Sequence, residues 1–273
     1  MPIIKAADGT ELYVKDWGQG RPVVLIHGWP LNADSWEYQA VPLAEAGYRV
    51  VAYDRRGFGR SGQPFAGYDY DMMADDLKAV IEGLSLSDAS VFGFSMGGGE
   101  VSRYMSRHGG KGIAQAGLIS SVAPFMLKTD DNPDGVDASV FEDMKAGLRK
   151  DRPGFLQDFF KTFYGVGKME EDVSDGVLHW SWMMAMMGSA KATLDCVDAF
   201  GTTDFRPDMA AFKVPTLIVH GTADETVPID PSGRAAAKAI AHSELKEYEG
   251  APHGLTATHA NRLTQDLKAF LQG

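Results

Sequence analysis

The sequence Gly93-Phe94-Ser95-Met96-Gly97 lies between a short apolar run, Ala89–Phe92, and a helical pattern from Gly98 to Arg107. A Gly-x-Ser-x-Gly pentapeptide between a strand and a helix is typical of a sharp turn that presents a serine at the end of a sheet. Glycines at both flanks remove the Cβ atoms that so tight a turn would bring into contact. We therefore predict that Ser95 is a nucleophile at the positive end of the following helix.

Two polar residues downstream of Ser95 also follow predicted strands. Asp224 follows the apolar run Val214–Gly221, and His253 follows the run Leu245–Tyr248 in a loop framed by proline and glycine. Because the carboxyl ends of parallel strands meet at one edge of a sheet, we expect Ser95, Asp224 and His253 to lie close together. His253 would then accept the serine proton and return it to the leaving group, while Asp224 orients the imidazole. The chain order Ser, Asp, His is one in which this triad occurs.

Neighbouring polar residues leave alternatives open. Glu225 and Asp230 follow the same strand as Asp224 and remain alternative acids. His220 belongs to the end of that strand, and we interpret it as structural. We interpret His27 as a residue that orients its loop through side-chain hydrogen bonds.

An oxyanion hole requires two backbone donors close to the nucleophile. The residue after the nucleophile supplies one, which is the N–H of Met96. The second is expected from a loop after an earlier strand, and Pro22–Ile26 is followed by His27-Gly28-Trp29-Pro30. We predict the N–H of Trp29 as this donor, since Pro30 has no N–H and can only shape the loop.

Strands and helices are predicted to alternate along most of the chain, which is typical of an α/β fold with a parallel sheet covered by helices on both faces. A hairpin at Asp8-Gly9 makes the predicted sheet mixed. The alternation stops between residues 123 and 205, where we predict four helices. They cover Asp137–Lys150, Pro153–Phe163, Asp172–Met187 and Ala190–Phe200. The domain prediction is a core of residues 1–122 and 206–273 with a helical cap, or lid, of residues 123–205.

Six stretches of sequence together resemble one known family. They are His27–Leu31, Asp34–Gln39, Tyr53–Ser61, Gly93–Gly98, Phe200–Asp208 and Ala251–Gly254. The chain resembles the α/β-hydrolase superfamily and, within it, the bacterial cofactor-free (non-haem) haloperoxidases, aryl esterases and perhydrolases. The resemblance runs from about Ile3 to Leu271. The resemblance is specific to this family within the superfamily because of Trp29, Trp36 and the run Asp204-Phe205-Arg206.

This resemblance implies a mostly parallel eight-stranded mixed sheet and a serine hydrolase of small aryl or short-chain acyl esters. An acyl-enzyme on Ser95 would be resolved by water to an acid, or by hydrogen peroxide to a peracid that oxidises halide. Pro30 beside Trp29 favours peroxide use in this family. The resemblance implies no haem, metal or other cofactor, and some members assemble as trimers or dimers of trimers.

The resemblance also places pocket residues in the cap. It implies that Phe159, Phe163 and Phe200 face the catalytic serine and contact the substrate. Many relatives carry aromatic residues where this chain has Met126 and Met144. Because methionine is more flexible, we expect an acyl pocket of different shape.

Composition excludes several classes of protein. The 273 residues carry a net charge of −11, which argues against nucleic acid and anionic membrane surfaces as partners. No apolar stretch is long enough to span a bilayer, and the N-terminus lacks the apolar segment of a signal peptide. The single cysteine, Cys196, is interpreted as a small buried side chain and suits a reducing compartment. We therefore predict a cytoplasmic protein.

Two other functions remain open on the same residues. The triad also supports a lactonase or a carbon–carbon bond hydrolase. A more remote alternative is a small-molecule receptor that retains the triad but turns over slowly, with the cap as its signalling surface. Fold alone does not separate these functions.

Overall fold

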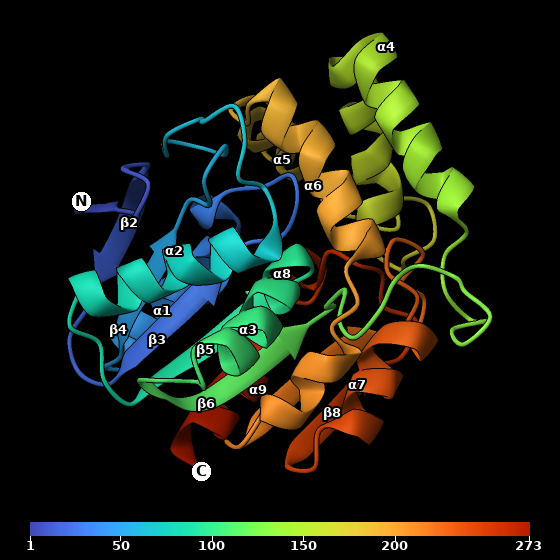
Figure 1. Ribbon diagram of the computed structural model, residues 1–273. Coiled ribbons are helices and arrows are strands. Elements are labelled where there is room, and N and C mark those ends of the chain that lie inside the picture. The colour runs from blue at the N-terminus through green and yellow to red at the C-terminus, as the bar shows by residue number, and fades with distance from the viewer.

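The computed structural model describes residues 1–273 and contains one eight-stranded sheet with helices on both faces (Figure 1). The strand order is β1-β2-β4-β3-β5-β6-β7-β8, with β2 antiparallel to β1 and β4 and all other neighbours parallel. The predicted mixed, mostly parallel sheet is confirmed. Its strands are β1 (Ile3–Lys5), β2 (Glu11–Trp17), β3 (Pro22–Ile26), β4 (Arg49–Tyr53), β5 (Ala89–Phe94), β6 (Ile113–Ile119), β7 (Thr216–Gly221) and β8 (Ser243–Tyr248).

Helices cover the sheet in two layers. α2 and α3 pack together on the face turned to the viewer in Figure 1, and α1 and α9 pack together behind the sheet. The helices are α1 (Glu37–Glu45), α2 (Tyr70–Gly83), α3 (Met96–Arg107), α4 (Ala138–Phe163), α5 (Asp175–Met186), α6 (Ala190–Thr202), α7 (Ala235–Ala239), α8 (Leu255–Thr258) and α9 (Ala260–Gln272). Short helical turns are η1 (Ala33–Trp36), η2 (Arg206–Ala211) and η3 (Asp230–Arg234).

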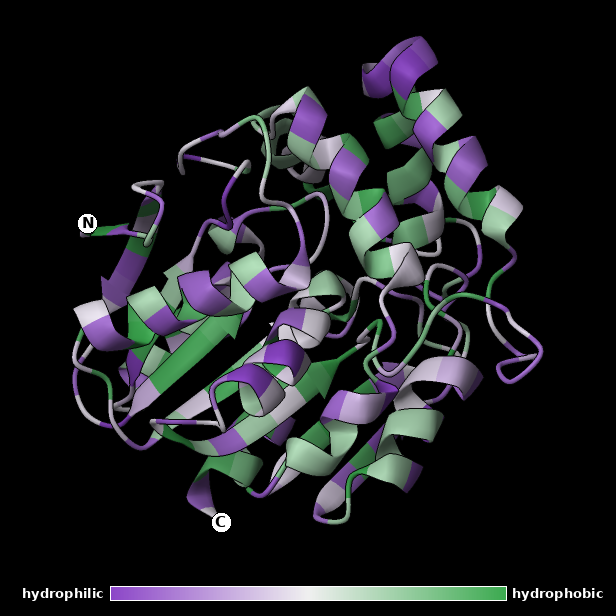
Figure 2. Ribbon diagram, viewed as in Figure 1, coloured by the Kyte–Doolittle hydropathy of each residue, from purple (hydrophilic) through white to green (hydrophobic).

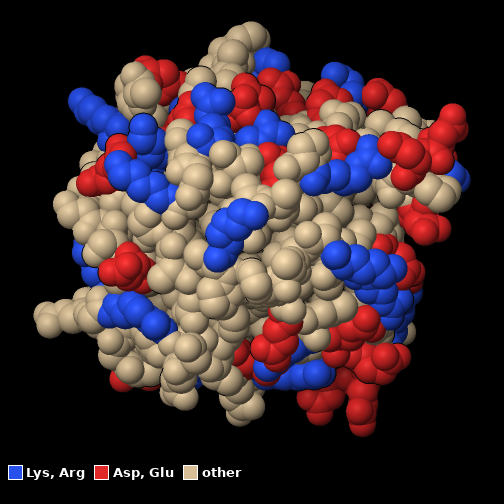
Figure 3. All heavy atoms as spheres, turned by 60° about the horizontal axis from the view of Figure 1, so that its bottom comes forward, with Lys and Arg blue, Asp and Glu red and all other residues tan.

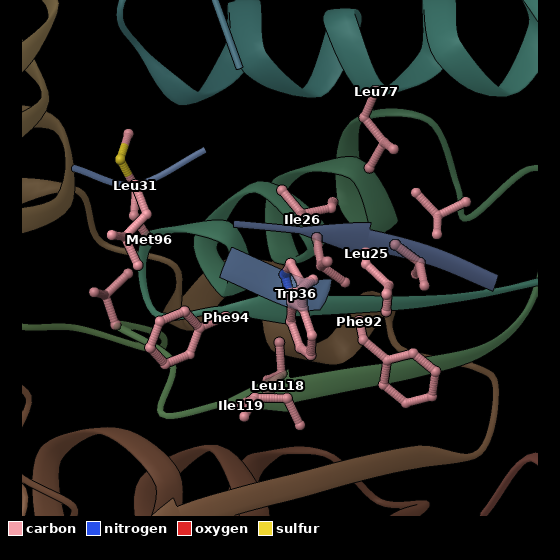
Figure 4. Packing of buried hydrophobic residues seen from close by; sticks show 14 of the residues in the cluster. Leu25, Ile26, Leu31, Trp36, Leu77, Phe92, Phe94, Met96, Leu118 and Ile119 are labelled. Carbon is pink, nitrogen blue, oxygen red and sulfur yellow. The ribbon is translucent and has the colours of Figure 1, made fainter. Parts of the chain in front are cut away.

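The central strands are apolar along their whole length because both faces of the sheet are covered. Every residue of β5 is buried, and so are all residues of β3 after Pro22. These strands form the hydrophobic centre of the ribbon in Figure 2. Side chains from β3, β5 and β6 share one core with Trp36, as the sticks for Ile26, Phe94 and Ile119 show in Figure 4.

Helices α4, α5 and α6 lie between β6 and β7 in the chain and group together at one end of the sheet (Figure 1). α4 is interrupted at Asp151, whose φ of −157° and ψ of 84° are not helical. Asp151 accepts the N–H of Gly154 at 3.1 Å and so caps the second half of α4, where Pro153 lies in the first turn and loses no hydrogen bond. The segment therefore contains four straight helical pieces.

The surface carries both signs of charge. On the face shown in Figure 3, acidic and basic side chains are interspersed among uncharged ones. Many are paired, as Arg234 is with Asp230 and Glu247. None of the helices combines the length and hydrophobicity that crossing a bilayer requires.

Candidate active site

Ser95 lies at the turn between β5 and α3 in a strained conformation. Its φ is 54° and its ψ is −118°, in a region that L-residues rarely adopt and that costs of order 1–3 kcal/mol. The turn is held by the Ser95 N–H, which donates to Ile119 O at 2.8 Å. A Cβ on Gly97 would lie 2.6 Å from Ile26 O, and one on Gly93 would overlap the Gly97 carbonyl. The glycines of the motif are therefore required by close backbone approach, as the sequence predicted.

The structure brings Ser95, His253 and Asp224 into one chain of hydrogen bonds. Ser95 Oγ lies 2.9 Å from His253 Nε2, and His253 Nδ1 lies 2.6 Å from Asp224 Oδ2. A carboxylate only accepts, so Nδ1 carries the proton and Nε2 is free to accept the hydroxyl proton of the serine. All three residues follow carboxyl ends of strands, and all are buried.

Asp224 is fixed on both carboxylate oxygens. Oδ1 accepts the backbone N–H groups of Thr226 at 2.9 Å and Val227 at 2.8 Å. Oδ2 accepts from His253 and also lies 3.3 Å from His220 Nε2. Burial by itself raises the pKa of Asp224, but His253 and His220 outweigh burial and lower this pKa to about 2. The carboxylate is therefore charged at neutral pH.

His220 contacts the triad, which the sequence did not predict. Its Nε2 lies 2.9 Å from Val227 O as well as 3.3 Å from Asp224 Oδ2. Both neighbours are acceptors, so Nε2 carries the proton. The Nδ1 atom of His220 is buried and has no partner. The side chain is inaccessible to solvent, and its one N–H donates to Val227 O beside the carboxylate of Asp224.

The alternative acids lie elsewhere. Glu225 is half exposed and pairs with Lys168 at 2.6 Å. Asp230 is largely exposed and pairs with Arg234 at 2.9 Å. Neither hydrogen-bonds His253, and Asp224 is the acid that contacts its Nδ1.

The two predicted oxyanion donors flank Ser95 and are unpaired. The backbone N–H of Met96 and that of Trp29 donate to no other protein group. Met96 begins α3, and Trp29 lies in the loop after β3, where a Cβ on Gly28 would fall 2.9 Å from Ser95 Cβ. The loop of Trp29 therefore runs directly against the nucleophile.

Buried polar contacts fix this loop. Arg55 Nη2 donates to His27 O at 2.8 Å, and Arg55 Nε pairs with Glu100 Oε2 at 2.8 Å. His27 donates from Nδ1 to Gly28 O at 2.8 Å and accepts the N–H of Arg55 on Nε2 at 2.9 Å. Burial and the nearby Arg55 lower the pKa of His27 well below its ordinary value, so the ring stays neutral. This is the orienting role predicted for His27.

A cavity of about 380 Å³ opens on the triad. Its wall contains Ser95, His253 and Trp29, and it is predominantly apolar. Trp29 is held in place by Phe159 and Phe200, with ring centroids 5.2 and 5.6 Å away, and by a hydrogen bond from Nε1 to Thr193 O at 3.0 Å. The remaining lining residues are Val122, Met126, Val136, Val140, Phe141, Met144, Phe155, Asp158, Phe159, Thr162, Phe200, Glu225, Thr226 and Val227.

The three predicted pocket aromatics occupy two different positions. Phe159 and Phe200 line the cavity. Phe163 does not line it and packs edge-to-face on the imidazole of His253, with ring centroids 4.8 Å apart. Phe159 and Phe163 share one face of α4, but Phe163 is one turn further along and is fully buried against the triad. Its contact is with the catalytic base instead of the cavity.

Sequence reasoning missed most of the cavity wall. Val136, Val140 and Phe141 come from the start of the cap segment, and Thr226 and Val227 from the loop after Asp224. Their apolar spacing equally predicts ordinary packing, so no sequence signal separated them. The structure contains no group of three or more His, Cys, Asp or Glu side chains placed to hold a metal ion.

The strand order, the turn at Ser95 and the loops at the strand ends define an α/β hydrolase. The chain matches the family described as the alpha/beta hydrolase fold over residues 21–260. It is 45% identical to a non-heme chloroperoxidase of Kitasatospora aureofaciens, with 99% of each chain covered. It is 42% identical to a bifunctional esterase/perhydrolase of Acinetobacter calcoaceticus, with 100% of each chain covered.

A solved structure agrees. The crystal structure of a bromoperoxidase from Bacillus anthracis matches with a TM-score of 0.96 and 45% identity, covering 100% of this chain and 99% of that one. The protein therefore belongs to the non-heme haloperoxidase and esterase/perhydrolase family of α/β hydrolases. The predicted family and enzyme class are confirmed.

Proposed function

We propose that this protein cleaves small aryl or short-chain acyl esters through an acyl-enzyme on Ser95, and that hydrogen peroxide competes with water for this intermediate. The observation that carries the proposal is the continuous chain of hydrogen bonds from Ser95 through His253 to Asp224 at the wall of an apolar cavity. Relatives named as esterase/perhydrolase and chloroperoxidase support the same chemistry.

The first half-reaction forms the acyl-enzyme. His253 Nε2 takes the proton of Ser95 as its Oγ attacks the ester carbonyl, and Asp224 stabilises the imidazolium. The carbonyl oxygen becomes an oxyanion that would accept hydrogen bonds from the N–H groups of Trp29 and Met96, a contribution of roughly 3–4 kcal/mol per donor. The proton then passes from His253 to the departing alcohol or phenol, and the C–O bond breaks.

The second half-reaction releases the acyl group. His253 removes a proton from water or from hydrogen peroxide, whose oxygen attacks the acyl carbonyl. Collapse of the second tetrahedral intermediate returns the proton to Ser95 Oγ. Water yields a carboxylic acid and peroxide yields a percarboxylic acid, with no change in the redox state of the protein.

The cavity sets the size of the acyl group. A volume of about 380 Å³ lies at the lower end for small-molecule sites and suits an aryl or short aliphatic group. Residues 123–205 supply most of the wall through α4 and α6, and we propose that this segment acts as a lid whose pose determines substrate preference. Assembly into trimers or dimers of trimers remains a prediction, which analytical ultracentrifugation tests. A cytoplasmic location is also a prediction, which cell fractionation tests.

The decisive experiment compares wild type with Ser95→Ala on an aryl acetate, with and without hydrogen peroxide, following phenol release and peracid in parallel. We expect Ser95→Ala to lose both signals. Ser106→Ala is a matched control, since Ser106 is an exposed serine of the same helix α3. Hydrolysis that survives Ser95→Ala would contradict the acyl-enzyme, and Ser95-dependent hydrolysis without peracid would contradict peroxide use.

A further inference from the structure

Two methionines share the cavity with the nucleophile. The chain has 13 methionines, and Met126 and Met144 are the ones that line the cavity with Ser95 and His253. Met126 is 1% exposed and Met144 is half-buried. Met96, although adjacent to Ser95 in sequence, is fully buried in the core and does not line the cavity (Figure 4). The cavity wall therefore presents two thioethers and otherwise mainly aliphatic and aromatic carbon to whatever forms on the serine.

Thioethers are the most readily oxidised groups on this wall. A methionine sulfur is converted to a sulfoxide by electrophilic oxygen, whereas aliphatic side chains are inert to it. The one thiol of the chain, Cys196, is buried outside the cavity, and burial raises the pKa of this thiol to about 12. It therefore offers no competing thiolate.

We propose that Met126 and Met144 are sites of self-oxidation, at which peracid formed on Ser95 transfers its terminal oxygen to the protein before it leaves the cavity. The inference rests on the proposed perhydrolase function. The sulfur attacks the terminal peroxy oxygen, the O–O bond breaks and an S–O bond forms. The peroxy proton ends on the departing carboxylate. Methionine is oxidised by two electrons to the sulfoxide, and the peracid is reduced to the carboxylic acid.

Confinement makes this transfer fast relative to oxidation from bulk solution. One molecule in a cavity of 380 Å³ corresponds to an effective concentration of about 4 M. Peracid that accumulates in bulk solution is far more dilute than this. The proximity of Met126 and Met144 to Ser95 therefore predicts that their oxidation follows turnover and not the concentration of oxidant in bulk solution.

Oxidation changes the site that causes it. A sulfoxide is polar and places an oxygen against the apolar wall of the acyl cavity. Binding of an apolar acyl group weakens, so activity falls progressively with the number of perhydrolytic turnovers. Methionine sulfoxide reductases reverse the modification, so the loss is recoverable.

Other methionines of the chain are internal references. Met183 and Met187 on and beside α5 are 51% and 44% exposed, so they report bulk oxidant. Met184 is 3% exposed and does not line the cavity, so it reports how far burial alone protects. Comparison with these three methionines distinguishes oxidation inside the cavity from oxidation that follows solvent exposure and from protection by burial.

The experiment is peptide mass spectrometry of the full chain after incubation with an aryl acetate and hydrogen peroxide, with peracid measured in a parallel sample. Controls are peroxide alone, ester alone and Ser95→Ala with both reagents. Excess free methionine in the buffer scavenges bulk peracid. We expect about tenfold or more sulfoxide at Met126 and Met144 relative to peroxide alone, undiminished by the scavenger and absent in Ser95→Ala. Met183 and Met187 should be protected by the scavenger, and Met184 should stay reduced.

The outcomes are distinguishable. If peracid forms but Met126 and Met144 are oxidised no faster than in peroxide alone, or only without scavenger, the inference is overturned while the proposed function stands. If no peracid forms, both fail together. In a second test, Met126→Leu/Met144→Leu conserves volume, and we expect it to remove the turnover-dependent loss of activity. Met183→Leu should leave that loss unchanged. Inactivation at the wild-type rate per turnover in the double variant would also overturn the inference.

Discussion

Replacing Asp224 by asparagine tests how the imidazole is held. Asp224 accepts hydrogen bonds on both oxygens, from Thr226 and Val227 on Oδ1 and from His253 on Oδ2, and His220 Nε2 lies 3.3 Å from Oδ2. An asparagine can keep the backbone bonds with its carbonyl oxygen, which places the NH₂ group at the position of Oδ2. Two donors would then face each other across 2.6 Å unless His253 moves its proton to Nε2. In that tautomer Nε2 has no lone pair for the proton of Ser95.

The expected loss of activity is large. The corresponding change in another serine triad lowers kcat by about 10⁴, equivalent to about 5 kcal/mol of transition-state stabilisation. The assay is kcat and KM on an aryl acetate for wild type and Asp224→Asn. Asp230→Asn is the matched control, since Asp230 is an exposed acid of the same chain segment that contacts Arg234 and not the triad. Activity of Asp224→Asn within tenfold of wild type would refute the assigned role of Asp224.

The same variant has a pH-dependent stability signature. The pKa of Asp224 falls from 3.8 to about 2 on folding, so its ionisation contributes about 2 kcal/mol to the free energy of unfolding. Because the folded-state pKa is the lower one, this contribution is complete above pH 3.8 and is lost as pH falls through about 2. Asparagine does not titrate. The difference in unfolding free energy between wild type and Asp224→Asn, measured in urea, should therefore shrink by about 2 kcal/mol across that range, and a constant difference would contradict the ion pair.

Three further changes probe the turn, the acid and the cavity. Gly97→Ala places a Cβ 2.6 Å from Ile26 O and should cost about 1–3 kcal/mol of stability, together with most of kcat. A thermal melt and an ester assay measure the two losses. The control is Gly176→Ala, whose nearest neighbour would lie at 3.4 Å, and it should lose neither stability nor activity. His220→Leu removes the N–H that lies 3.3 Å from Asp224 Oδ2, so kcat/KM should fall roughly tenfold and its acid limb should move to higher pH. His220→Gln can still donate and should recover most of the activity. Identical pH profiles would remove His220 from the mechanism. Val227→Thr adds a hydroxyl beside the triad and should lower the ratio of peracid to acid several-fold. Val140→Thr, on an exposed part of the wall, should leave this ratio unchanged. An unchanged ratio in both variants would show that cavity polarity does not set the partition between water and peroxide.

The proximity of the three candidate catalytic residues was predictable because it follows from simple topology. A serine, an acid and a histidine that each follow a buried parallel strand must meet at one sheet edge. Local backbone rules identified Ser95, since a turn of that geometry requires glycine on both sides. The sequence favoured Asp224 but left Glu225 and Asp230 open as acids, and the structure puts Asp224 in hydrogen-bond contact with His253.

The cavity wall was not predictable in the same way. Phe159 and Phe163 lie one turn apart on α4, and only the docking of that helix decides that Phe163 contacts His253 and Phe159 lines the cavity. The contact of His220 with Asp224 depends on how the loop after β7 folds back on the strand end. Both contacts depend on tertiary packing, which the pattern of residues along the chain does not reveal.

Partition between water and peroxide explains why an apolar wall matters to this chemistry. Bulk water exceeds millimolar peroxide by a factor of about 5 × 10⁴, so equal partition requires a deacylation barrier about 6 kcal/mol lower for peroxide. Greater intrinsic nucleophilicity of peroxide supplies part of this difference. The wall supplies another part, because aliphatic and aromatic side chains such as Val227 and Phe159 offer water no hydrogen bonds beside the acyl carbonyl. A cavity that disfavours ordered water thus favours the rarer nucleophile, and the same confinement exposes Met126 and Met144 to the product.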